Sequence, residues 1–160
     1  MKIAFANPAQ PATGVAVAFA TAGRQLMASA QVLDKQAGGA LTRAVKGSKF
    51  KGNKGQTLTL MAPAGSKLNR IILVGLGKAK DIDDLGMQGL GGKVQANVAA
   101  SGQTTASVLV DEVADSGLSV TDMAANLAYG ARLRAYRFDK YRTTEEADKK
   151  PSLKNLRGLC

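Results

Sequence analysis

A glycine pair beside a lysine offers the first candidate chemistry in this chain. Gly75-Leu76-Gly77-Lys78 follows the apolar run 70–74 and precedes a stretch with helical signals. Backbone amides in that position can bind phosphate at the start of a helix. However, the dinucleotide fingerprint needs a third glycine where Lys80 stands, and the P-loop pattern fails at Ile72 and Ala79. The spacing therefore favours a tight strand-to-helix turn over a nucleotide site.

A second group of glycines precedes Lys93 and imitates a phosphate-binding loop. Its spacing misses the P-loop pattern by one residue, because Met87 stands where the first glycine belongs. Small residues in a helix also allow that helix to pack closely against a sheet. We assign no ligand to this group, which comprises Gly86, Gly89, Gly91 and Gly92.

Basic side chains dominate the charged groups. The sequence contains 22 lysine and arginine residues against 12 acidic residues, which gives a formal net charge of +10 at pH 7. This excess favours acidic partners such as DNA or RNA, although a solvated surface is its usual explanation. No helix-turn-helix, zinc finger or RNA-binding aromatic motif accompanies it. The candidate nucleic-acid contacts are Arg43, Lys46, Lys49, Lys51 and Lys54. A second basic cluster comprises Arg132, Arg134, Arg137, Lys140 and Arg142.

The chain itself offers little for catalysis or metal binding. It contains no histidine, which excludes Ser-His-Asp catalysis, Cys-His catalysis and His-ligated zinc supplied by this chain alone. One acidic group complements the dipole at a predicted helix start and the other follows a strand. These groups are Asp81, Asp83 and Asp84, and Asp111, Glu112 and Asp115. We therefore expect no catalytic, cofactor-binding or metal-binding residue in this chain.

The strands that would position these residues are short and mostly apolar. Several runs are rich in β-branched residues or alternate between polar and apolar side chains, as strands do. Helical signals separate many of these runs, so we expect an α/β domain with a mixed, mainly parallel sheet. The predicted strands cover residues 2–6, 14–20, 56–61, 70–74 and 106–110.

Three helices are predicted from apolar residues that recur every three or four positions. The first covers residues 30–45, although Gly38-Gly39 weaken it, and its apolar positions are Val32, Leu33, Ala37, Leu41 and Val45. The second follows the acidic residues 81–84. The third covers 120–138 and begins after a capping-box-like Ser-x-x-Asp. The inward residues of the second are Leu85, Leu90, Val94 and Val98. Those of the third are Val120, Ala124, Leu127, Ala131, Ala135 and Phe138.

The length of 160 residues fits one domain. We place it at residues 1–142, because 143–150 is polar except for Ala147 and Pro151 follows, so that 143–160 reads as a linker. The only cysteine is Cys160, which excludes an internal disulfide and fits a reducing cytoplasm. No apolar run is long enough to cross a membrane, and we expect no membrane partner.

Three stretches carry a resemblance to a known family. The first is Leu33-Asp34 through Gly47, continuing into Phe50-Lys51-Gly52 and Gly55-Gln56-Thr57-Leu58, and the second is residues 70–78. The third and most specific is Gly130-Ala131-Arg132-Leu133 with Tyr136-Arg137-Phe138-Asp139-Lys140-Tyr141. In this order and spacing they resemble the N-terminal domain of the leucyl aminopeptidase (cytosol aminopeptidase) family, over roughly residues 1–145.

The resemblance implies a macro-like α/β domain placed before a larger catalytic domain. In that family the catalytic domain holds two divalent ions, commonly zinc or manganese, and removes N-terminal residues from peptides, preferably leucine. The enzyme assembles as a homo-hexamer. Its metal ligands and its catalytic lysine and arginine lie in motifs such as Asn-Thr-Asp-Ala-Glu-Gly-Arg, which does not occur in this chain. No catalytic residue can therefore be carried over to a position in this sequence.

Two functions remain open at this point. The first is a non-catalytic domain of a dimetal aminopeptidase, inactive alone, with a structural or regulatory role beside its own catalytic domain. The alternative is a nucleic-acid- or nucleotide-binding module that uses the basic clusters and the Gly75–Gly77 turn. An independent enzyme is disfavoured by the missing histidine and the absence of convergent carboxylates.

Overall fold

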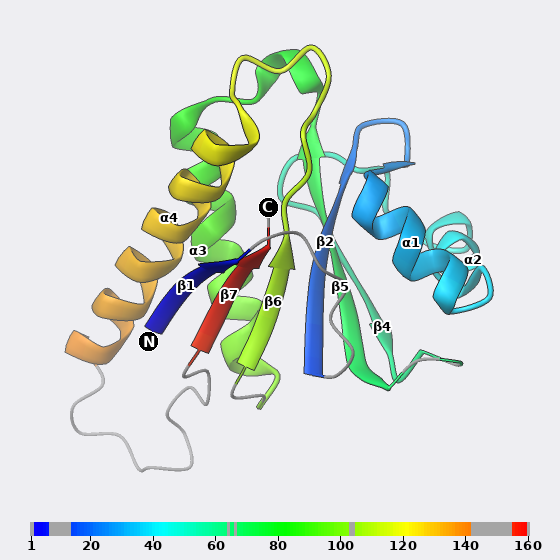
Figure 1. Ribbon diagram of the computed structural model, residues 1–160, viewed down its shortest axis with the longest axis horizontal. Coiled ribbons are helices and arrows are strands. Elements are labelled where there is room, and N and C mark those ends of the chain that lie inside the picture. Colours follow the sequence, from blue (N-terminus) through cyan, green and yellow to red (C-terminus); the bar gives the residue numbers. More distant parts are fainter. Residues whose placement is uncertain are drawn as a thin grey trace.

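The computed structural model describes residues 2–6, 14–63, 65, 67–102, 105–141 and 155–159, which alternate between strands and helices (Figure 1). The strands are β1 (Lys2–Ala6), β2 (Gly14–Thr21), β3 (Gln25–Leu26), β4 (Thr57–Met61), β5 (Leu68–Gly77), β6 (Thr105–Leu109) and β7 (Asn155–Leu159). The helices are α1 (Ala28–Gln36), α2 (Ala40–Lys46), the 3₁₀ turn η1 (Ala79–Asp81), α3 (Asp84–Ala100) and α4 (Val120–Tyr141).

The described strands form one mixed sheet in the order β1-β7-β6-β2-β5-β4, and β3 pairs with β2 beside this path. The pairs β1–β7, β7–β6, β6–β2 and β2–β5 are parallel, whereas β4 runs antiparallel to β5 and β3 antiparallel to β2. This arrangement confirms the predicted α/β class with a mixed, mainly parallel sheet.

The C-terminal strand differs from the expected linker. Residues 155–159 form β7, which lies between β1 and β6 and pairs with both. Asn155 is opposite Lys2 on one side and Thr105 on the other. The polar stretch 143–150, on which the linker prediction rested, lies outside the described residues. The linker prediction missed β7 because both of its pairing partners are distant in sequence.

Helices cover both faces of the sheet. Alternate residues of β2 point to opposite faces, as the two-residue repeat of a strand requires. Val15, Val17 and Phe19 join the core beneath α3 and α4. Ala16, Ala18 and Ala20 join the core beneath α1 and α2. Because both faces are covered, the strand is apolar throughout rather than alternating.

The predicted helix over 30–45 is two helices. Gly38 and Gly39 adopt positive φ angles of 64° and 81°, a left-handed conformation that ends α1 before α2 begins. The Asp34 carboxylate accepts hydrogen bonds from the backbone N–H and the hydroxyl of Thr42, which fixes the turn. The inward face is confirmed at Leu33, Ala37, Leu41 and Val45, which are buried, whereas Val32 is 40% exposed.

Helices α3 and α4 approach each other through glycine. A Cβ added to Gly91 would lie 2.0 Å from the Leu127 carbonyl oxygen, and one added to Gly130 would lie 1.8 Å from the Gln88 carbonyl oxygen. Glycine at these two positions therefore lets the helix backbones touch. We expected the glycines of this helix to pack against the sheet, but Gly91 packs against α4.

A polar chain reinforces the same crossing. Gln88 donates to the Asn126 side chain at 2.9 Å, and Asn126 donates to the Asp84 carboxylate at 2.7 Å. Leu90, Val94 and Val98 are buried as predicted. Leu85, however, is 77% exposed in the first turn of α3.

Helix α4 begins and packs as the sequence predicts. The Ser119 hydroxyl accepts a hydrogen bond from the Asp122 backbone N–H at 3.1 Å, which confirms the cap. Val120 is half-buried against the core, and the surroundings of the Phe138 side chain lie outside the described residues. Its predicted buried face is confirmed at Ala124, Leu127, Ala131 and Ala135.

Truncating the buried face of α4 tests this packing. We expect Leu127→Ala to lower the free energy of unfolding by about 2–5 kcal/mol, because it removes buried methyl groups and leaves a cavity. Leu133→Ala should lower the free energy of unfolding by less, because the Leu133 side chain on the same helix is 36% exposed. Urea unfolding followed by circular dichroism measures both, and an unchanged midpoint for Leu127→Ala would show that the helix is placed incorrectly.

The helix crossing gives a second test with an internal control. We expect Gly130→Ala to destabilise the fold by about 1–3 kcal/mol or more, because the methyl group forces the two backbones apart. Gly89→Ala, also within a helix but with open space around its Cβ, should instead stabilise it by about 0.5–1 kcal/mol. Thermal melts of both variants show whether each melting temperature falls or rises. Equal melting temperatures would contradict the backbone contact.

Candidate functional site

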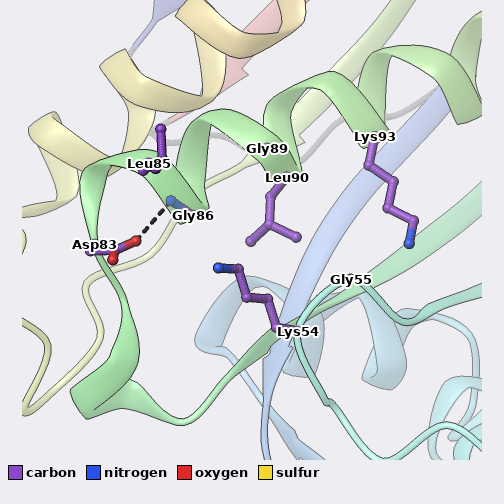
Figure 2. Close-up of a pocket in the computed structure, with 8 residues that line it drawn as sticks. All are labelled: Lys54, Gly55, Asp83, Leu85, Gly86, Gly89, Leu90 and Lys93. Carbon is purple, nitrogen blue, oxygen red and sulfur yellow. Dashed lines mark hydrogen bonds between the residues drawn. The ribbon is translucent and has the colours of Figure 1, made fainter.

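The five cations proposed for nucleic-acid contact lie on two adjoining segments. Arg43 and Lys46 belong to α2, and Lys49, Lys51 and Lys54 belong to the segment that joins α2 to β4. All five side chains are exposed. The Arg43 guanidinium donates to the Gly38 carbonyl at 2.9 Å, which turns it back toward the turn between α1 and α2. The remaining four are placed to meet an external anion, although Lys54 lies apart beside α3 (Figure 2).

The segment that carries these lysines is held in place by its backbone. The Lys51 carbonyl accepts from the N–H groups of Gly23 and Arg24, each at 3.1 Å, and Phe50 is buried. Gly52 lies so close to β2 that an added Cβ would be 2.0 Å from the Thr21 carbonyl oxygen. The segment is therefore an exposed loop whose backbone is held firmly in place.

Lys54 faces a hollow of about 380 Å³ between this segment and α3 (Figure 2). From the opposite side Lys93 of α3 points toward Gly55, and its ammonium lies 3.2 Å from the place of a Cβ there. Within the described part of the chain, neither ammonium group has a carboxylate partner. Lys93 stood out in the sequence as the residue after a glycine group, but it could not be placed near Lys54, because 39 positions separate the two residues and only the fold brings them together.

The start of α3 completes this hollow. Asp83 caps the helix by accepting from the Gly86 backbone N–H at 2.7 Å. Gly86 has no side chain, so the Lys54 ammonium fits against the first turn, 2.6 Å from the place of a Cβ. Two cations and a helix N-terminus can attract an anion, but they supply no general base and no nucleophile.

A smaller hollow of about 220 Å³ lies beyond the carboxyl end of β5. Ligands of open α/β sheets commonly bind at such an edge. Here, however, the Gly75 N–H donates to the Gln56 carbonyl at 2.8 Å and the Gly77 N–H donates to the Gly52 carbonyl at 2.9 Å. These amides already have partners and do not cradle a phosphate. The geometry is that of a turn packed against the lysine-bearing segment.

The second basic cluster lies on the other side of the sheet. Arg132 and Arg134 of α4 are exposed. The side-chain surroundings of Arg137 and Lys140, and all of Arg142, lie outside the described residues. Because α4 and α2 cover opposite faces of the sheet, the structure does not bring the two clusters together.

The acidic residues serve the fold. Asp111, which follows β6, accepts hydrogen bonds from the backbone N–H and the hydroxyl of Ser29 at 3.1 and 2.7 Å, and so caps α1. Sequence reasoning missed this contact, since the two residues are 82 positions apart. Among the residues that the structure describes, no three His, Cys, Asp or Glu side chains gather as metal ligands. A dimetal centre therefore does not fit the described residues.

No helix within the described residues is both long and apolar enough to span a membrane.

Comparison with known structures establishes the fold family. A mutant of tomato leucine aminopeptidase superposes with a TM-score of 0.75 at 22% identity, covering 100% of this chain and 32% of that chain. The macrodomain of Mycobacterium tuberculosis DarG gives a TM-score of 0.67 at 11% identity and covers 99% of this chain and 98% of its own. The fold is thus macro-like, as expected.

Sequence comparison establishes the family. A probable cytosol aminopeptidase of Caulobacter vibrioides is 39% identical over 142 residues, which are 89% of this chain and 27% of the relative. One from Rhodopseudomonas palustris is 38% identical over 148 residues, 92% of this chain and 29% of the relative. The chain thus spans less than a third of these relatives. The model of the cytosol aminopeptidase family N-terminal domain matches residues 15–145, and this chain belongs to that family.

Proposed function

We propose that this chain is the non-catalytic N-terminal domain of a dimetal aminopeptidase that removes N-terminal residues from peptides, with a structural or regulatory role beside the catalytic domain. The match to the family's N-terminal domain carries this proposal. The lack of a metal-ligand cluster among the described residues supports it, because the chemistry then belongs elsewhere in the parent protein. The family names of the relatives support a cytoplasmic location.

The metal ions of the parent enzyme belong to this proposal as well. We place two divalent ions, zinc or manganese, in the catalytic domain, where they would activate water and polarise the scissile carbonyl. One structural neighbour, the bottromycin maturation enzyme BotP, was solved in complex with Mn. Assembly of the parent as a homo-hexamer completes the proposal.

The isolated chain should not hydrolyse leucine p-nitroanilide, with or without added Zn²⁺ or Mn²⁺. Two-metal hydrolysis needs several fixed ligands around ions about 3.5–4 Å apart. Release of p-nitroaniline, followed by absorbance, measures the activity. The full-length Caulobacter relative, assayed in parallel, is the positive control. Chelator-sensitive turnover that survives rigorous purification of the isolated chain would contradict the proposal.

Nucleic-acid binding is a second candidate, favoured by one observation. Lys46, Lys49 and Lys51 are all exposed on a firmly held segment, and the chain carries a net charge of +10. Such a surface attracts phosphate backbones without reading sequence.

Salt dependence tests this second candidate. We expect weak DNA binding that is independent of sequence and is lost steeply with salt, each phosphate contact adding about 0.9 to the slope of log affinity against log salt. Reversing Lys46, Lys49, Lys51 and Lys54 to Glu should abolish it and leave the circular dichroism spectrum unchanged, because the four side chains are exposed. Fluorescence anisotropy measures the affinity. Sequence-selective binding at physiological salt would instead make this domain a nucleic-acid reader.

A further inference from the structure

The outer face of α4 carries a row of large apolar side chains. Tyr129, Leu133 and Tyr136 are 58%, 36% and 63% exposed. Their spacing of four and three residues places them on one face of the helix. The opposite face holds Leu127 and Ala131, which are buried against the sheet. Helix α4 is therefore apolar on two faces, only one of which is covered in this structure.

Concentration in one place distinguishes this row from ordinary exposed residues. Single apolar side chains scattered over a surface are common and need no explanation. In the described part of the chain, however, half of the large exposed apolar side chains lie in this row. The full set is Val32, Met61, Leu85, Tyr129, Leu133 and Tyr136. Helix α4 packs beside α3 (Figure 1), and the exposed fractions of the three side chains show that the row faces solvent.

The composition of the row is that of a protein interface. Tyrosine and arginine are enriched at interface centres, and the exposed Arg132 flanks the row. No acidic residue occurs on α4 between Asp122 and Asp139. The face therefore matches an apolar surface that carries carboxylates.

A second copy of this chain fits the face poorly. In a two-fold antiparallel pair of α4 helices centred on Leu133, the Arg132 side chains of the two copies would lie on the same flank of the interface, close to each other. Like charges placed opposite each other disfavour association. A different, acidic surface is the better complement.

We propose that the row Tyr129–Leu133–Tyr136 is the docking surface for the catalytic portion of the parent aminopeptidase, which presents an apolar patch with a carboxylate for Arg132. This inference rests on the proposed function. Leu133 and Tyr136 lie in the segment that most specifically resembles the family, yet neither is buried in this domain, so its own core does not account for them. The chain spans only 27–29% of its curated relatives, which leaves a large remainder to cover the face.

Hydroxyl-radical labelling tests the proposal on two proteins, the isolated chain and a chimera in which this chain replaces the matching segment of the Caulobacter relative. Labelling of Tyr129 and Tyr136 should fall by about fivefold or more in the chimera, because interface centres exclude water. Met61, 57% exposed on β4, is the control and should be labelled equally in both. Equal labelling of the two tyrosines in a chimera that hydrolyses leucine p-nitroanilide would overturn the docking surface and leave the proposed function standing.

A second arm uses two separate polypeptides, so that the proposal does not depend on a folded chimera. The chain should copurify with the remainder of the Caulobacter relative when both are expressed together. The triple variant Tyr129→Ser, Leu133→Ser, Tyr136→Ser should lose that copurification, whereas Leu85→Ser, which removes a 77% exposed apolar side chain elsewhere, should retain it. Circular dichroism checks that both variants fold. Copurification by the triple variant, or dimerisation of the isolated chain through this face, would overturn the proposal. If the intact Caulobacter relative does not hydrolyse leucine p-nitroanilide, that result would instead contradict the proposed function.

Discussion

The contact between the backbones of α3 and α4 governs the arrangement of this domain. Gly91 and Gly130 let the helices approach until a Cβ on either would strike the carbonyl of the other. This proximity allows both helices to place apolar rows on the same sheet face, where Leu90 and Leu127 join one core. It also sets the rotation of α4 about its axis. The face turned outward, with its two tyrosines, is thus determined by two residues that have no side chain.

Much of the fold could be predicted because its signals are local. The apolar runs of β2, β5 and β6 and the three- to four-residue repeat of α4 each lie within one segment of sequence. The rest depended on contacts between distant residues. A helix over 30–45 satisfied the repeat, and only the left-handed Gly38 and Gly39 broke it. Strand β7 has no strong pattern of its own and takes its conformation from its neighbours on both sides.

In the candidate site, too, local features could be predicted and contacts between distant residues could not. Exposure of the lysines could be predicted, since lysine side chains are almost never fully buried unless they are paired. Their surroundings could not. Lys54 and Lys93, 39 positions apart, line the same hollow. Asp111 caps α1 through Ser29, which is 82 positions away. The glycines at 75 and 77 carried a plausible phosphate signal, but their amides proved to be used by the neighbouring segment.

Strand β7 has a consequence for how the chain folds as it is synthesised. Among the described residues, β1 pairs with β7 alone, so β1 is synthesised well before residues 155–159, which supply its neighbour. Until then β6 presents an open edge, the kind of surface on which other nascent chains aggregate. Such long-range closure slows folding, because the entropy of the loop is lost before the pairing is gained. Strands β1 and β7 thus behave as one late-folding unit. A chaperone that shields the edge of β6 would act before these two strands pair.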